Sequence, residues 1–284
     1  MNAIARFAMQ GPRQAALMAV LFAAIPLMYW VSAAVVALVI LRQGLSKGFN
    51  VLLPALLPGV AWYAVQQDIT VFMVVLGSAL MATVLRLSVS LPKSIAVSTL
   101  LGLAVVMLLP NLSPMWLEVL QKGAQEYSQL LTPEDPRTAT MLTPWILPML
   151  LGGIAAMLQL FAIGALLMAR HWQSALFNPG EFSKEFQGFR LPIGYVVLAL
   201  VVLFIGISSA ELASGIPVML VPLFIMGISV VHSVVAIKQL SSQWLMAFYI
   251  SMLFFMPYMY ALLILVALLD VMFNIRSKLN DTAN

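Results

Sequence analysis

The chain has 284 residues, of which 63% are hydrophobic and 8% are charged, and its mean hydropathy is +1.03. A soluble domain carries about 25% charged residues, so this composition excludes an ordinary soluble globular fold. Cysteine is absent, which excludes disulfides, thiolate metal sites and cysteine nucleophiles. The net charge of +4 arises from Lys and Arg in short connections between apolar segments. It therefore indicates membrane orientation and does not indicate binding to nucleic acid.

Apolar runs that approach the roughly 20 residues of a membrane span recur along the chain. No long polar linker divides them. They predict one all-α integral membrane domain over residues 1–284, a polytopic transmembrane helix bundle of about 8 spans, within a range of about 6 to 10. In chain order the segments are 14–41, 49–66, 70–87, 94–110, 142–170, 191–208, 215–237 and 242–271.

The first and last runs are long for one helix, and each contains a proline, Pro26 or Pro257. Proline inside a helix removes a backbone hydrogen bond and kinks or breaks the helix. We therefore expect 14–41 to form two short helices, or else one long tilted helix with an outside N-terminus. The basic start resembles a secretory signal, but its apolar run exceeds the about 7–15 residues of a signal-peptide core, which favours an uncleaved anchor.

Charge placement predicts the orientation, because Lys and Arg favour the cytoplasmic side of short loops. If each middle segment crosses once, the connections 42–48, 87–93, 171–190 and 238–241 share one face, which together with the adjoining Arg86 and Arg170 carries eight basic residues. The opposite face carries Lys122 and Arg137. The first face is therefore predicted to be cytoplasmic. Arg6 and Arg13 fit this face only if 14–41 enters and returns, and Arg276 and Lys278 leave the side of the C-terminus open.

Two stretches are amphipathic and are expected to lie along the membrane surface, namely 114–131 on the outer face and 180–190 on the inner face. The apolar residues of the first recur at helical spacing and are Trp116, Leu120, Ala124, Tyr127 and Leu131. In the second, Phe182, Phe186 and Phe189 recur among charged residues. This second stretch is either a docking helix for a cytoplasmic partner or a helix whose Phe face lies in the lipid headgroups.

Small residues at four-residue spacing let membrane helices approach closely. Ala15, Ala19 and Ala23 form one such stripe, and Ser94, Ser98 and Gly102 form another. Each stripe is expected to be a helix-packing seam or a contact for a partner.

Ionisable groups inside a membrane usually mark function, because burying them is costly. The ten acidic residues all lie in loops or at segment ends, which disfavours a transporter that depends on buried carboxylates. Gln159 lies in the middle of its segment, where a hydrogen bond between helices would explain it. Trp62, Tyr63 and Trp145 are candidates for lining an outward-facing pocket.

No catalytic constellation is evident. His171 and His232 are the only histidines and lie on separate segments. The chain contains no phosphate-binding loop, no HExxH and no GxSxG motif. We therefore expect a protein that is not an enzyme, with no catalytic residue, no metal site and no cofactor.

Two stretches resemble a known family. Residues 27–30 and 32–41, followed by Arg42-Gln43-Gly44-Leu45, resemble the YybS-like family of uncharacterised bacterial membrane proteins. Residues 170–173 and 177–182, with Phe186 and 190–192, are similar to the proteobacterial branch of that family. The resemblance implies a multi-pass protein of the bacterial inner, or cytoplasmic, membrane.

That family is distantly similar to the S components of energy-coupling-factor vitamin transporters. The resemblance implies an S-component-like core in which Ala15, Ala19 and Ala23 would meet a coupling subunit. Arg42 and Gly44 would match the short turn after the second helix. The extra segments and the insert 111–140 depart from the S-component pattern.

Two functions are therefore expected, besides an enzyme that no motif supports. The first is uptake or binding of a vitamin-like small molecule, with a coupling subunit as partner. The alternative is a non-catalytic scaffold or assembly factor in a bacterial envelope complex, with 180–190 as its contact. The expected partners are thus the lipid bilayer and another membrane protein, and not nucleic acid.

Overall fold

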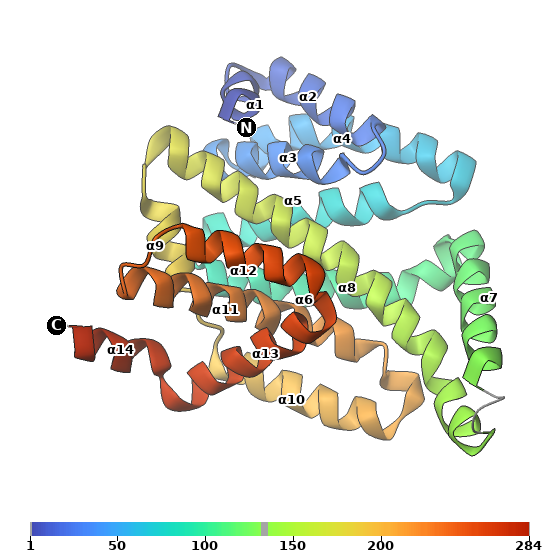
Figure 1. Cartoon of the computed structure of the whole chain (residues 1–284). Helices are drawn as coiled ribbons and strands as arrows, with labels where there is room; N and C mark the ends of the chain where they lie inside the picture. The colour runs from blue at the N-terminus through green and yellow to red at the C-terminus, as the bar shows by residue number, and fades with distance from the viewer. Residues whose placement is uncertain (1, 132–135, 284) are drawn as a thin grey trace.

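The computed structural model describes residues 2–131 and 136–283, and it confirms the predicted all-α fold (Figure 1). These residues form helices and no strand. The helices are α1 Asn2–Ala8, α2 Pro12–Ala24, α3 Tyr29–Gln43, α4 Leu45–Gln66, α5 Thr70–Ser88, α6 Leu91–Leu112, α7 Pro114–Leu131, α8 Pro136–Phe177, α9 Glu181–Gln187, α10 Ile193–Ser208, α11 Gly215–Ile237, α12 Gln243–Phe254, α13 Met256–Phe273 and α14 Ile275–Ala283, with a short 3₁₀ turn at Ala210–Leu212.

The helices have the length and composition of a membrane protein. Within the described ranges, 6 helices are long and apolar enough to cross a bilayer: α4, α5, α6, α8, α11 and α13. Shorter apolar helices, α2, α3, α10 and α12, lie among them. The bundle exposes large apolar side chains on its sides, as Leu57 at 65%, Phe204 at 75% and Leu253 at 78% show. Such a surface is suited to lipid, so the chain is an integral membrane protein.

Two helices, α3 and α11, form the most buried parts of the bundle. Every residue of α3 from Val31 to Leu41 is buried, and so are most residues of α11 between Val218 and Ser233. The 42-residue helix α8 packs against both, and against α5 and α6. In Figure 1 it crosses the molecule diagonally between the N-terminal helices and the C-terminal ones. α8 therefore joins the two halves of the core.

The run 14–41 forms two helices, α2 and α3, which pack against each other. The chain between them is extended at Ile25, as expected for a residue that precedes proline, and left-handed at Leu27, where φ is 63°. α2 has 13 residues and α3 has 15. Each helix is therefore only about 20 Å long, which is less than the roughly 30 Å of a bilayer core.

The run 242–271 is also broken. α12 ends at Phe254, and Pro257 lies in the first turn of α13, where a missing backbone N–H costs nothing. α12 has 12 residues, so it is about 18 Å long and too short to cross the bilayer alone. The two runs 14–41 and 242–271 thus each form a pair of consecutive helices broken near a proline.

The bundle has two ends, which hydrogen bonds between helix termini define. Arg86 at the end of α5 donates from Nη1 to the Leu41 carbonyl of α3 at 2.6 Å, and Gln173 of α8 donates to the same carbonyl at 3.5 Å. Trp62 of α4 donates to the Ala23 carbonyl of α2 at 3.3 Å. We call the end with Arg86 and Gln173 the α9 end, and the end toward which Trp62 lies the α7 end, after the helices that lie there (Figure 1).

Helix α8 is longer than a membrane is thick. Its 42 residues make a helix of about 63 Å, roughly twice the 30 Å core. Its first turns extend past the other helices at the α7 end, where α7 lies beside them (Figure 1). Pro144 and Pro148 lie in this part of α8.

Glycines mark places where helices touch through their backbones. A Cβ on Gly227 of α11 would fall on the carbonyl of Leu263 in α13, and one on Gly152 of α8 would fall on the Ser214 carbonyl. Gly164, also in α8, faces open space. Close approach of this kind is how small residues hold membrane helices together.

This difference between glycines predicts a stability effect. Gly227→Ala should lower the free energy of unfolding by about 1–3 kcal/mol, because α11 and α13 must separate to admit the methyl group. Gly164→Ala is the matched control and should leave stability unchanged or raise it by about 0.5–1 kcal/mol. Thermal unfolding of both variants in a mild detergent measures the effect. Equal midpoints for the two variants would contradict the assignment of a backbone contact at Gly227.

Candidate functional site

A cleft of about 540 Å³ opens between α7 and the first half of α8, at the α7 end. Gly123 and Tyr127 line it from α7, and Trp145 lines it from α8. The other lining residues are Leu142, Ile146, Met149 and Leu150, so the wall is mainly apolar and includes no charged residue. Its volume falls in the range of roughly 300–1,000 Å³ that small-molecule sites occupy.

Polar contacts hold α7 in place over α8. Ser113, just before α7, is fully buried and donates to the Gln67 carbonyl at 2.6 Å. The backbone N–H of Met115 donates to Gln67 Oε1 at 3.2 Å. Further along, the hydroxyls of Ser128 and Thr143 lie 2.9 Å apart. α7 is thus tied to the α4–α5 turn at one end and to α8 at the other, and the cleft lies between these ties.

The other side of the α7–α8 contact is polar. A hollow of about 580 Å³ there is lined by Gln121, Gln125 and Gln129, which repeat every four residues along α7. Thr143 faces it from α8. A molecule at this end therefore meets an apolar surface on one side of α7 and neutral amides on the other.

The other two aromatic candidates lie on α4. Trp62 uses its indole N–H to bind the Ala23 carbonyl, and Tyr63 is 38% exposed. Neither residue belongs to the lining of the α7–α8 cleft. The structure therefore does not bring Trp62, Tyr63 and Trp145 into one cleft.

The alanine stripe lies inside the chain. Ala15, Ala19 and Ala23 are each at most 1% exposed, and α2 packs against α3 and α4. The stripe is thus a packing seam, and it has no free surface to offer a coupling subunit.

The phenylalanines of 180–190 point into the bundle. Phe186 and Phe189 are buried, at 9% and 1% exposure. Phe182 stacks on Phe186, whose ring also meets His232 edge-on at 5.3 Å between centroids. This differs from both expected roles, docking and headgroup contact, because the Phe face is covered by the chain itself. Glu181 and Lys184 lie on the exposed side of α9 and form a salt bridge, with 3.6 Å between Lys184 Nζ and Glu181 Oε1.

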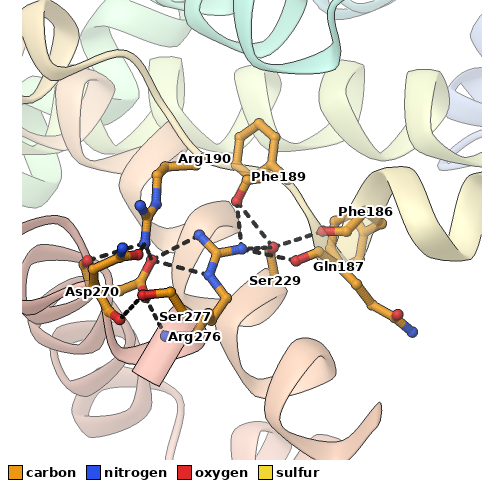
Figure 2. A network of polar contacts seen from close by, with 9 residues as sticks. Phe186, Gln187, Phe189, Arg190, Ser229, Asp270, Arg276 and Ser277 are labelled. Atoms are coloured by element: carbon orange, nitrogen blue, oxygen red, sulfur yellow. Dashed lines mark hydrogen bonds and ion pairs between the residues drawn. The ribbon is translucent and has the colours of Figure 1, made fainter. Parts of the chain in front are cut away.

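A buried ionic network lies at the α9 end (Figure 2). Asp270, in the last turn of α13, is 0% exposed. Arg276 of α14 donates to Asp270 Oδ2 from Nη2 at 2.7 Å and from Nε at 3.0 Å. Its own backbone N–H donates to Oδ1 at 3.2 Å. Arg190, just before α10, donates from Nη2 to Oδ2 at 2.9 Å.

Arg276 ties this carboxylate to the rest of the bundle. Its Nη1 donates to the carbonyls of Gln187 and Phe189 at 2.8 and 3.0 Å (Figure 2). The hydroxyl of Ser229 in α11 donates to the carbonyls of Phe186 and Phe189 at 2.7 and 3.2 Å. The network therefore fastens α9, α11, α13 and α14 to one another.

Sequence reasoning missed this network. The sequence places Asp270 at the end of a segment, and it presents Arg190 and Arg276 only as basic residues that bear on orientation. The signal for the network is a carboxylate at the end of a long apolar run, close to the face that carries most of the arginines. Such a carboxylate is stable in a membrane only with a cationic partner.

A second ionic cluster lies nearby. Arg170 Nε is 2.7 Å from Glu185 Oε2, an ion pair by distance that lacks the angle of a hydrogen bond. Arg170 also donates to Gln173 Oε1 at 3.3 Å. Together with Arg86 and Asn178 these residues line a cavity of about 360 Å³.

Polar side chains in the middle of the bundle bind each other. Gln159 of α8 is fully buried and donates to Ser98 Oγ of α6 at 2.8 Å, which confirms the predicted hydrogen bond between helices. The hydroxyls of Thr99 and Tyr195 lie 2.8 Å apart, and Tyr195 also donates to the Met219 carbonyl. These bonds join α6 to α8, α10 and α11.

Acidic, histidine and cysteine side chains do not gather into a possible metal site anywhere in residues 2–131 and 136–283. His232 lies 2.8 Å from the Tyr249 hydroxyl, and His171 meets the Phe182 ring. Both histidines thus have aromatic neighbours in the bundle.

Compared with known proteins, the chain matches no family model, no curated protein and no solved structure.

The ionic network predicts a large effect of one conservative change. Asp270→Asn should lower the free energy of unfolding by about 3–5 kcal/mol, since Arg276 would keep a buried charge without a counter-charge. Glu211→Gln, at an exposed acid of the α7 end, is the control and should change stability by less than about 0.5 kcal/mol. Thermal unfolding in detergent tests both. An Asp270→Asn variant that unfolds at the same temperature as the unaltered protein would show that the network does not stabilise the bundle.

Proposed function

We propose that this protein is a non-enzymatic component of a bacterial inner membrane that binds a small apolar or amphiphilic molecule from the outer side and takes part in its uptake. The cleft between α7 and α8 is the observation that supports this proposal most directly. It combines a suitable volume, an aromatic and apolar wall and a position at one end of a membrane bundle.

Charge distribution supports the orientation. The paired helices α2–α3 and α12–α13 bring both chain termini to the α9 end (Figure 1). All basic residues except Lys122 and Arg137 then belong to that end: Arg6, Arg13, Arg42, Lys47, Arg86, Lys93, Arg170, Lys184, Arg190, Lys238, Arg276 and Lys278. By the positive-inside rule, the α9 end is the cytoplasmic one. The cleft then opens on the outer side.

The chemistry of the cleft favours an uncharged or weakly polar ligand. Burying an unpaired charge against an apolar wall is costly, and the lining of this cleft offers no counter-charge. Trp145 and Tyr127 provide ring faces with one polar group each, which suits a flat or amphiphilic molecule. A vitamin-like compound with an apolar body fits this description.

Membership of the YybS-like family is part of the proposal, and it rests on the sequence stretches that resemble that family. The further likeness to S components meets one difficulty, since Ala15, Ala19 and Ala23 are buried by α3 and α4. A coupling subunit would therefore contact another surface of the α9 end.

A scaffold in an envelope complex is the second candidate. It is favoured by close packing in the centre of the bundle, where a Cβ on Gly102 would meet both Val218 and Gln159. A solid core with lateral clefts suits a protein that holds partners together. The ligand experiment below separates the two candidates.

The proposed orientation can be tested directly, because the chain contains no cysteine that would need removal. Glu126→Cys, on α7, should react with a membrane-impermeant maleimide added to intact cells or spheroplasts. Lys238→Cys, after α11, should react only once the membrane is permeabilised. The reverse pattern would place the cleft in the cytoplasm and contradict uptake from outside.

Ligand binding can be tested by filling the cleft. Gly123 lies in its wall, and a Cβ there meets nothing within 4 Å. Gly123→Leu should therefore occupy the cleft without disturbing the fold and should lower the amount of co-purifying small molecule about ten-fold. The measurement is mass spectrometry of the small molecules and proteins recovered with the tagged protein from its native membrane in gentle detergent.

Gly153→Leu is the matched control, since Gly153 lies on α8 outside the cleft and also faces open space. It should retain the ligand at the level of the unaltered protein. Loss of ligand in both variants, or no ligand in either, would contradict the proposal. Recovery of envelope proteins alone would favour the scaffold.

A further inference from the structure

A cavity of about 490 Å³ lies beside the ionic network at the α9 end. Arg190 and Arg276 form its charged wall, and no acidic residue lines it. The remaining lining residues are Gln187, Gly188, Ser233, Ala236, Ile237, Asn274 and Ser277. It is therefore a polar, positively charged cavity at the rim of a membrane bundle.

The charges in this network do not balance. Two guanidinium groups, of Arg190 and Arg276, share the single carboxylate of Asp270. That carboxylate is 0% exposed and lies behind the arginines, so the cavity itself faces only the cations. One positive charge is left over at a place where the membrane lowers the local dielectric constant. A bound anion would neutralise it.

Arg190 has hydrogen-bonding capacity to spare. All hydrogen bonds between Arg190 and the described residues come from its Nη2, which donates to Asp270 and, at 2.6 Å, to Asn274 Oδ1. Its Nε and Nη1 have no partner in this part of the chain, although its side chain is only 38% exposed. Arg276 differs, because all three of its guanidinium nitrogens donate to protein groups. Arg190 is therefore the residue able to bind a ligand.

The cavity offers both polar and apolar groups. Asn274, Gln187 and Ser233 provide neutral polar groups, and Ala236 and Ile237 provide apolar ones. Exposed apolar residues are close in sequence to this lining: Leu240 at 38% follows Ile237, and Met272 at 72% and Phe273 at 51% precede Asn274. A ligand with a charged head and apolar chains would find a partner for each part.

We propose that this cavity binds the phosphate of an anionic phospholipid headgroup, with Arg190 as the main contact. Arginine presents parallel N–H groups that match two phosphate oxygens. Basic cavities between helix ends on the cytoplasmic side of a membrane bind acidic lipids in this way. The bound lipid would fill the space between the α9–α10 connection, the end of α11 and the start of α14, and it would complete the charge balance of the network.

The neighbouring cavity at Arg86 and Arg170 does not suit an anion equally well. Glu185 belongs to its lining, so a phosphate there would meet a carboxylate. Arg86 already binds the Leu41 carbonyl at the C-terminus of α3, and Arg170 binds Glu185. The comparison favours the Arg190 cavity.

The test uses the whole protein in detergent with three probes: phosphatidylglycerol, phosphatidylcholine and inorganic phosphate. Native mass spectrometry counts bound lipids, and thermal unfolding measures stabilisation by each probe. Phosphatidylglycerol should bind and raise the unfolding midpoint, and phosphatidylcholine should do so much less. Arg190→Gln should weaken phosphatidylglycerol binding about five- to ten-fold, because a charge-assisted contact is lost.

Two further variants keep the test decisive. Lys238→Gln removes a charge from an exposed residue that lies just outside the cavity and should bind the lipid as the unaltered protein does. Arg190→Lys keeps the charge and replaces Arg190→Gln if that variant does not fold; it should bind more weakly than arginine. The proposal is overturned if Arg190 variants bind normally, if Lys238→Gln loses as much affinity, or if inorganic phosphate alone reproduces the whole stabilisation.

Discussion

Inside a bilayer, every backbone N–H and C=O group must find its partner within the protein, because hydrocarbon offers none. This constraint explains why the described residues form helices throughout and why the helices break where they do. The α2–α3 break at Pro26 and the α12–α13 break at Pro257 come after only 13 and 12 residues of helix, at the ends of α2 and α12 that lie away from the α9 end. Exposed carbonyls near a break find side chains there: the Trp62 indole donates to Ala23. At the opposite end Arg86 does the same for Leu41.

The same constraint sorts the polar side chains. In the centre of the bundle they are neutral, and Gln159 donates from its amide nitrogen to Ser98. Charged residues gather at the two ends, where water and headgroups reduce the cost of exposing them. Asp270 is the instructive exception, because a fully buried carboxylate is tolerated only where its oxygens accept hydrogen bonds from cations. Its position in the last turn of α13 allows two arginines to reach it from the headgroup region while its helix remains in the membrane.

The fold was largely predictable from the sequence, and the sites were not. Apolar runs predict helices because membrane spans need about 20 apolar residues. Pro26 and Pro257 mark breaks in long runs, whereas Pro54, Pro148 and Pro222 lie inside continuous helices. The predicted stretch 114–131 has the same bounds as α7. Proline marks its start, and its amphipathic pattern continues to Leu131. What the apolar side of a helix contacts is harder to predict. The Phe182, Phe186 and Phe189 pattern predicts a helix over 180–190, but α9 ends at Gln187 and Phe189 lies beyond it. The pattern also does not tell whether the apolar face meets lipid, a partner or, as observed, the bundle itself.

Sites depend on contacts between segments far apart in the chain, which periodicity does not encode. Trp145 is a candidate from the sequence because it is aromatic and lies near the start of its segment, but its partner Tyr127 and the opening at Gly123 depend on how α7 lies on α8. Arg190 and Asp270 are 80 residues apart in sequence. Their pairing follows from the orientation of α13: the short helix α12 carries the chain away from the α9 end, and α13 then returns it there with Asp270 in its last turn.

The two sites lie at opposite ends of the bundle, and this separation limits how the protein can work. Between them the core contains Gln159, Thr99 and Tyr195 as paired polar groups, and glycines whose neighbours leave no space for a side chain. A ligand held between α7 and α8 could therefore not pass through a fixed channel. If the proposed ligand is taken up, helices would have to shift at the contacts of α8 and α6 with α11, where the N-terminal and C-terminal halves meet. The ionic network fastens α9, α11, α13 and α14 into one body at the α9 end, so such a shift would move that group as a unit.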